Sequence, residues 1–189
     1  MTISQATKAA VFHQLTLLAL VLAASDAQAA RKQAVLIGVE RYRHPMLADL
    51  DFVCDDVTDF AVVLREVGFE VILLTDEVGK AYAKRAPTRE NVDRAIARGL
   101  DTCKGKEDLS LHVLAEHGIQ FGDGSGAYFC PTDGRPFAEE KRTLVSINGF
   151  YDRIKRSYAG TKLVLIDAFR VNPRAPRGRG ITSDVANPI

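Results

Sequence analysis

The sequence contains no tryptophan, only 7% aromatic residues, and no excess of either charge, because 25 Lys and Arg against 24 Asp and Glu leave a formal net charge of +1. Scarce aromatics argue against a stacking platform for single-stranded nucleic acid. A balanced charge argues against nucleic-acid binding through bulk charge. Glycine and proline, at 14 and 7 residues, are not enriched, which excludes collagen-like and low-complexity classes. The 47% hydrophobic share over 189 residues suits one packed domain.

Cysteine is also scarce, and the count of three is odd. A closed disulfide framework is therefore excluded, and we expect at most one bridge and one leftover thiol among Cys54, Cys103 and Cys130. The histidines at 44, 112 and 117 show no metal-ligand spacing. The glycine-rich segment 122–126 lacks the Gly-Lys-Ser/Thr ending of a phosphate loop. We expect neither a metal nor a cofactor.

The N-terminal segment differs in character from the rest of the chain. Lys8 precedes an apolar run over 15–24, and small residues at Ala27 and Ala29 follow. This order is typical of a secretory signal, so we expect residues 1–29 to be removed and the protein to be exported. The run is shorter than the ~20 residues of a membrane span, so we expect no stable span. An uncleaved anchor or a non-native helix is the alternative.

Short apolar runs alternate with segments of helical periodicity in the remainder. We expect strands at 33–39, 69–74, 109–114 and 163–166, helices at 50–64, 88–100 and 146–158, and a small hairpin around 122–130. This order predicts an α/β fold with a mostly parallel sheet flanked by helices, with all four strands buried. The segment 171–189 is rich in Arg, Pro and Gly and predicts a loop. We expect no further helix or strand in this segment. Whether the chain ends before the fold is complete therefore stays open.

Polar residues follow the predicted strands at the edge where parallel sheets bind ligands. His117 and Gly118 follow the third strand, and Asp167 follows the fourth. Asp56 lies near the start of the first helix. Imidazole titrates near neutrality, and a glycine lets its backbone N–H approach a developing oxyanion. For each of these residues a structural role, such as a strand-end histidine or a charge at a helix N-terminus, is the alternative.

Several segments, in this order and spacing, resemble the caspase-like peptidases, the group that holds caspases, metacaspases and their bacterial relatives. The similar segments run from about residue 33 to about residue 170, within an expected domain of residues 30–170. They are Ala34 to Tyr42, Leu50 to Val57, Gly68 to Val71, Pro87 to Val92, His117-Gly118, Gly126 to Asp133 and Leu165 to Arg170. The resemblance implies a three-layer sandwich of the caspase-hemoglobinase type.

The resemblance also implies a cysteine peptidase mechanism. A thiolate attacks the scissile carbonyl, while the histidine, here His117, moves protons. Backbone N–H groups at Gly118 and at the nucleophile hold the oxyanion. In metacaspase-type members carboxylates select a basic residue before the scissile bond, and the matching positions are Asp56 and Asp167. The implied partner is therefore a protein or peptide with basic residues; the oligomeric state stays open.

The chain departs from the family at two positions. Phe169 occupies the position of the nucleophilic cysteine, and a phenyl ring cannot form an acyl-enzyme. Glu116 replaces the usual glycine before the histidine, and we expect its carboxylate to favour imidazolium. The three cysteines fit small buried or surface residues better than displaced nucleophiles. We therefore expect an exported caspase-like domain without proteolytic activity, acting in binding or regulation.

Two alternatives remain beside this hypothesis. One is an active cysteine endopeptidase that cleaves after Arg or Lys, with position 169 altered from cysteine. The other is an unrelated doubly wound α/β binding domain whose match is generic to parallel sheets.

Overall fold

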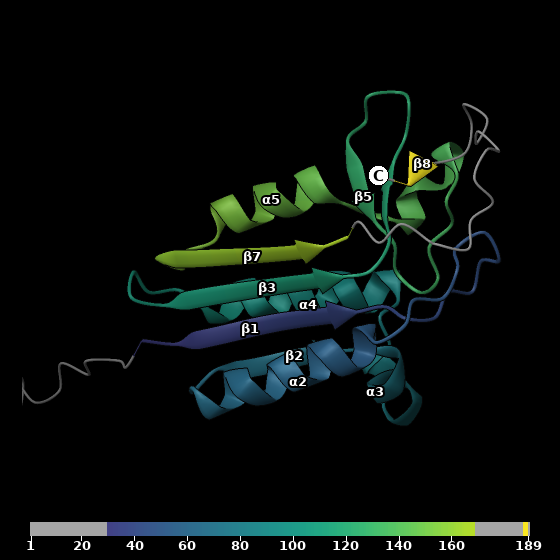
Figure 1. Cartoon of the computed structure of the whole chain (residues 1–189). Coiled ribbons are helices and arrows are strands. Elements are labelled where there is room, and N and C mark those ends of the chain that lie inside the picture. Colours follow the sequence, from purple (N-terminus) through teal and green to yellow (C-terminus); the bar gives the residue numbers. More distant parts are fainter. Residues whose placement is uncertain (1–29, 169–186, 189) are drawn as a thin grey trace, which may run out of the picture.

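The fold, in a computed structural model that describes residues 30–168 and 187–188, alternates strands and helices as the sequence predicts (Figure 1). The predicted signal 1–29, Phe169 and most of the segment 171–189 lie outside the described residues. The elements are β1 (Lys32–Gly38), α2 (Val53–Glu66), β2 (Glu70–Leu74), α3 (Asp76–Ala81), η1 (Ala83–Arg85), α4 (Arg89–Thr102), β3 (Leu109–Ala115), β4 (Gly118–Gln120), β5 (Ala127–Phe129), η2 (Ala138–Thr143), β6 (Val145–Ser146), α5 (Ile147–Arg156), β7 (Thr161–Asp167) and β8 (Asn187–Pro188).

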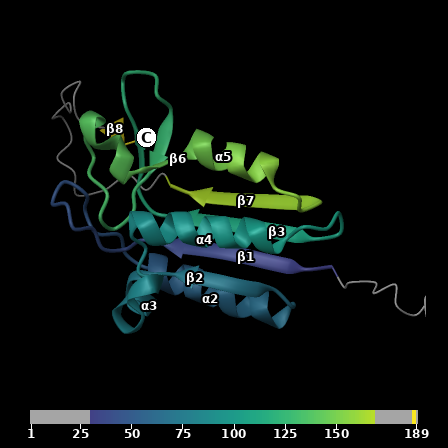
Figure 2. The ribbon, with the colours of Figure 1, turned by 180° about the vertical axis from the view of Figure 1, so that it is seen from behind.

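A parallel sheet with strand order β2-β1-β3-β7 forms the centre of the fold. Helix α2 covers one face, while α4 and α5 lie on the other, as the view from behind shows (Figure 2). Strand β1 is nearly continuous apolar sequence because its alternate side chains enter both cores: Ala34 and Leu36 pack with α2, and Val35 and Ile37 pack with α4. The predicted α/β class is confirmed.

Strand β7 is not buried on both faces, and this part of the prediction is wrong. Its side chains alternate between exposed and half-buried, and Leu163 and Leu165 are 48% and 49% exposed. Two features explain the exposure: β7 is the outermost of the described strands, and α2 packs against β1 and β2 instead of reaching across to it. Four apolar residues in a row therefore do not distinguish a central strand from an edge strand.

A second, small antiparallel sheet has the order β6-β5-β4-β8. The predicted hairpin is present, with Gly118 opposite Phe129. Ser146, the first residue of the third predicted helix, caps α5 by accepting the Gly149 N–H at 3.2 Å. Within the segment 171–189, for which no element was expected, β8 pairs with β4. The short elements α3 and β6 were also missed. In the described part of the chain, no helix is both long and apolar enough to cross a bilayer.

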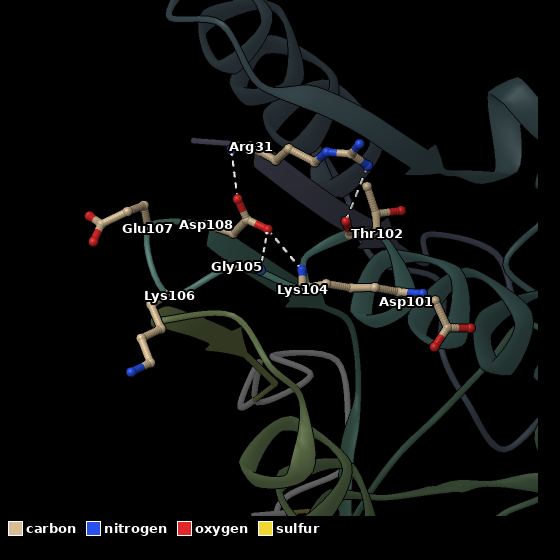
Figure 3. A pocket seen from close by; sticks show the side chains of 8 residues that line it. All are labelled: Arg31, Asp101, Thr102, Lys104, Gly105, Lys106, Glu107 and Asp108. Atoms are coloured by element: carbon tan, nitrogen blue, oxygen red, sulfur yellow. Dashed lines mark hydrogen bonds between the residues drawn. The ribbon is translucent and has the colours of Figure 1, made fainter. Parts of the chain in front are cut away.

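The loop between α4 and β3 closes on a single carboxylate at the amino end of the sheet (Figure 3). The Asp108 carboxylate accepts the backbone N–H groups of Arg31 at 2.9 Å and of Lys104 and Gly105 at 2.8 Å each. These three bonds lower the pKa of Asp108. They link Arg31, directly before β1, to the loop that precedes β3.

Replacing this carboxylate tests how much its hydrogen bonds contribute to stability. Asp108→Asn retains one acceptor oxygen, so at least one of the three N–H groups loses its partner, and we expect the free energy of unfolding to fall by roughly 1–2 kcal/mol at neutral pH. Because the folded pKa lies below the unfolded one, the difference from wild type should shrink as the pH falls through about 4. Urea titrations measure it, and Glu107→Gln, an exposed neighbour, is the control. Equal losses for both substitutions would contradict the assignment.

Phe52, directly before α2, adopts a backbone conformation that disfavours side chains. Its φ is 68°, and it is the single non-glycine residue with positive φ among the described ones. Its ring is 70% exposed, so packing contributes little there. We expect Phe52→Gly to be more stable than Phe52→Ala by about 1 kcal/mol, because only glycine adopts this region without a Cβ clash. Chemical denaturation compares the two variants, and a more stable alanine variant would refute the strain.

Candidate functional site

The carboxyl ends of β3 and β7 bring His117 and Gly118 beside Asp167 and Ala168. The parallel register places Ala115 opposite Asp167. Beyond it, the Glu116 N–H donates to the Asp167 carbonyl at 3.1 Å, and the Gly118 N–H donates to the Ala168 carbonyl at 2.6 Å. A Cβ at position 118 would collide with that carbonyl, so this close approach requires glycine. Ala168, directly after β7, therefore lies next to the residues that follow β3.

The His117 side chain is held in one orientation. It is 9% exposed, and its Nε2 lies 2.7 Å from the Ala48 carbonyl oxygen. A carbonyl oxygen only accepts, so Nε2 carries the hydrogen and Nδ1 keeps the lone pair. The ring of Tyr42 packs on the imidazole, with ring centroids 4.9 Å apart. Burial lowers the pKa of His117, which favours the neutral, basic form.

Glu116 does not interact with the imidazole, and the expectation that it favours imidazolium is wrong. Its side chain is completely buried, and Oε2 accepts the Cys130 N–H at 2.9 Å. Oε1 has no hydrogen-bond partner within the described residues. Burial raises the pKa of Glu116 well above its ordinary value, which favours the protonated, neutral carboxyl. A neutral acid exerts no net charge on His117.

The two candidate specificity carboxylates lie at the surface on separate elements. Asp167 is the exposed last residue of β7, and Asp56 is exposed in the first turn of α2. Both elements have these ends at the carboxyl edge of the main sheet (Figure 1). Asp56 also lies where a helix N-terminus favours negative charge, and its backbone N–H donates to the Phe52 carbonyl at 2.9 Å. This placement suits a role in recognising a basic residue and equally suits a purely structural role.

All three cysteines are buried and unpaired. Burial raises the pKa of the Cys54 thiol to about 11, that of Cys103 to a lesser degree, and that of Cys130 strongly. Reactive cysteines have lowered pKa values and partial exposure. Each thiol thus has the properties of a packing residue.

The remaining histidines with described positions are apart from the site. His112 is buried in the core, where its Nε2 lies 2.9 Å from Ser110 Oγ, and His44 packs edge-on against Phe137. Within residues 30–168, no cluster of His, Cys, Asp and Glu is suited to a metal ion.

Sequence reasoning missed two residues that hold His117, namely Tyr42 and Ala48. Ala48 acts through its carbonyl, which every residue possesses, so no sequence signal identifies it. Tyr42 lies inside the segment used for the family resemblance, but nothing in its pattern indicated a contact with residue 117. Both come from the loop between β1 and α2, about seventy residues earlier in the chain.

The buried acid at position 116 makes a testable contribution to stability. Glu116→Gln keeps an acceptor for the Cys130 N–H but has no proton to lose. Because the folded pKa is raised, wild type loses stability as pH rises above about 4.3, by up to ~1.4 kcal/mol per pH unit. We expect the variant to be more stable at pH 7 and the gain to vanish near pH 4. Denaturant titrations across pH, with exposed Glu139→Gln as control, check this; a pH-independent difference would exclude a buried neutral acid.

Comparison with known proteins agrees with this geometry. A family model described as the caspase domain matches residues 31–186, which is most of the chain. A search of curated proteins found no match. The parallel sheet, the His-Gly pair after β3 and the strand end at Asp167 occupy the described part of the matched segment. The chain therefore belongs to the caspase-domain family.

Proposed function

We propose that this domain is an exported, proteolytically inactive member of its family that binds peptides or proteins carrying basic residues. The sequence at position 169 carries the proposal. Phe169 directly follows Ala168, whose carbonyl is bonded to the residue after His117. The residue that the family resemblance aligns with the nucleophile is thus a phenylalanine, which has no nucleophilic atom.

Two further observations support the loss of proteolysis. The Gly118 N–H, which an oxyanion would need, already donates to the Ala168 carbonyl, so oxyanion binding would first require this bond to break. No cysteine offers a replacement nucleophile, because all three thiols are buried with raised pKa values. A neutral thiol at neutral pH is a poor nucleophile.

The basic partner is inferred from the acidic side chains at the same edge of the sheet. Asp56 and Asp167 are exposed, and a carboxylate pairs with a guanidinium through charge-assisted hydrogen bonds. Export is inferred from the signal-like segment 1–29, with its apolar run and the small residues at 27 and 29.

The second candidate is an active endopeptidase that cleaves after Arg or Lys. One observation favours it: His117 retains an orienting carbonyl at Nε2 and an unprotonated Nδ1, the arrangement a general base requires. This candidate still needs a cysteine at position 169.

A cleavage assay separates the two candidates. We expect the wild-type protein to leave a peptide library with Arg or Lys at each position uncut, since no group forms an acyl-enzyme. Phe169→Cys should react with thiol-directed peptide probes that carry Arg, and the second change His117→Ala should slow that reaction. Mass spectrometry measures both. Wild-type cleavage that His117→Ala abolishes would instead establish an active peptidase.

Binding is tested on the inactive protein itself. Fluorescence anisotropy with Arg-containing peptides should give weaker binding for Asp167→Asn than for wild type, because the charge-assisted bond is lost. Glu139→Asn, an exposed acidic residue on η2, is the matched control. Equal affinity of wild type and both variants would remove Asp167 from the proposed site.

A further inference from the structure

Tyr42 contacts every part of the core. It lies four residues after β1 ends and packs against all three buried clusters, namely the two faces of the main sheet and the cluster beneath the small sheet. Such a residue cannot shift without disturbing all three layers, because protein interiors are close-packed. Its ring and hydroxyl therefore have fixed positions.

Both parts of this side chain contact His117. Tyr42 Oη accepts the His117 backbone N–H at 3.0 Å and donates to the Val39 carbonyl at 3.3 Å. The phenol ring lies on the imidazole at a centroid distance of 4.9 Å and an interplanar angle of 38°. One side chain thus holds the backbone of residue 117 and one face of its ring.

The carbonyl that accepts from the imidazole belongs to the same loop as Tyr42. Asp49, adjacent to Ala48, accepts the Tyr42 N–H at 3.2 Å and the Arg41 guanidinium at 2.8 Å. Tyr42 and Ala48 are therefore linked through Asp49. One loop therefore supplies two contacts to the His117 side chain. The Tyr42 ring packs on the face of the imidazole, and the Ala48 carbonyl accepts from Nε2.

We infer that Tyr42 is the positioning residue of His117 and holds its imidazole in the single tautomer with hydrogen on Nε2. The inference deepens the proposed function, on which it rests for the role of His117 at the peptide site. Tyr42 touches no reacting atom; it acts through the imidazole. Removing the phenol ring of Tyr42 exposes the face of the His117 imidazole to water. The imidazole can then rotate away from the Ala48 carbonyl.

Nuclear magnetic resonance of the full chain with isotope-labelled histidine tests the inference. In wild type the ring-nitrogen shifts of His117 should report one tautomer, hydrogen on Nε2. In Tyr42→Leu they should report a mixture of both tautomers, and the pKa of His117 should rise toward ~6.5, because water reaches the ring. Tyr42→Phe keeps the ring but removes the acceptor, so the His117 amide should exchange roughly tenfold faster. Tyr128→Phe, on the small sheet, is the control.

A merely structural role would lower the melting temperature of the Tyr42 variants and leave the His117 tautomer and pKa unchanged, and that result would overturn the inference. If Tyr42→Leu does not fold, unchanged amide exchange in Tyr42→Phe overturns it equally. These readouts use the wild-type site without any cleavage or binding assay. Failure of the positioning role is therefore distinguishable from failure of the proposed function, which peptide cleavage or loss of peptide binding reports.

Discussion

The candidate site depends on the parallel pairing of β3 with β7. Seven residues of each strand are in register, and the pairing continues past the strands through the bond from the Gly118 N–H to the Ala168 carbonyl. Parallel neighbours carry their carboxyl ends to one edge, so residues fifty positions apart in the chain become adjacent. Without this register His117 and Gly118 would not lie beside Asp167 and Ala168.

The second constraint is the loop between β1 and α2, which carries both groups that hold the imidazole. The loop has little regular structure, yet backbone and side-chain bonds fix it on several sides. Asp76, the first residue of α3, accepts the Glu40 and Arg41 N–H groups at 2.7 and 3.2 Å. Thr132 donates its hydroxyl to the Arg41 carbonyl at 2.6 Å. A loop tied to α3 and to the segment after β5 positions a site almost as firmly as a strand does, and functional residues frequently lie on loops held in this way.

The sequence predicted the frame of the fold because the frame depends on local periodicity. The apolar runs of β1, β2 and β3, the helix starts near Thr88 and Ser146, and the hairpin all appear where the pattern indicates them. The errors have a different origin. Whether Leu163 and Leu165 are covered depends on which strand α2 crosses, which is a tertiary property that four consecutive apolar letters do not encode.

The site itself was predictable only in part, for the same reason. The placement of His117, Gly118 and Asp167 at one edge of the sheet was predicted because each follows a predicted strand. Tyr42 and Ala48 were not found, because their contacts with His117 depend on the path of a loop about seventy residues away. The prediction for Glu116 was wrong because two neighbouring residues in the sequence can point their side chains in different directions. The Glu116 carboxyl points toward the Cys130 N–H and not toward the imidazole.

The pair Glu116 and His117 determines what kind of electrostatics the site can offer. Both groups are buried, and burial raises the pKa of the acid and lowers that of the imidazole, which favours the neutral form of each. In their neutral forms these two groups offer dipoles and hydrogen bonds, and no net charge, to a ligand. The proposed attraction for a cationic side chain comes instead from exposed carboxylates at the sheet edge, such as Asp56 and Asp167. Attraction between exposed charges is screened by salt. The contacts of His117 with Tyr42 and with the Ala48 carbonyl are buried and are screened much less. Ionic strength should thus separate the two contributions to recognition, with long-range attraction weakening and the orientation of the imidazole unaffected.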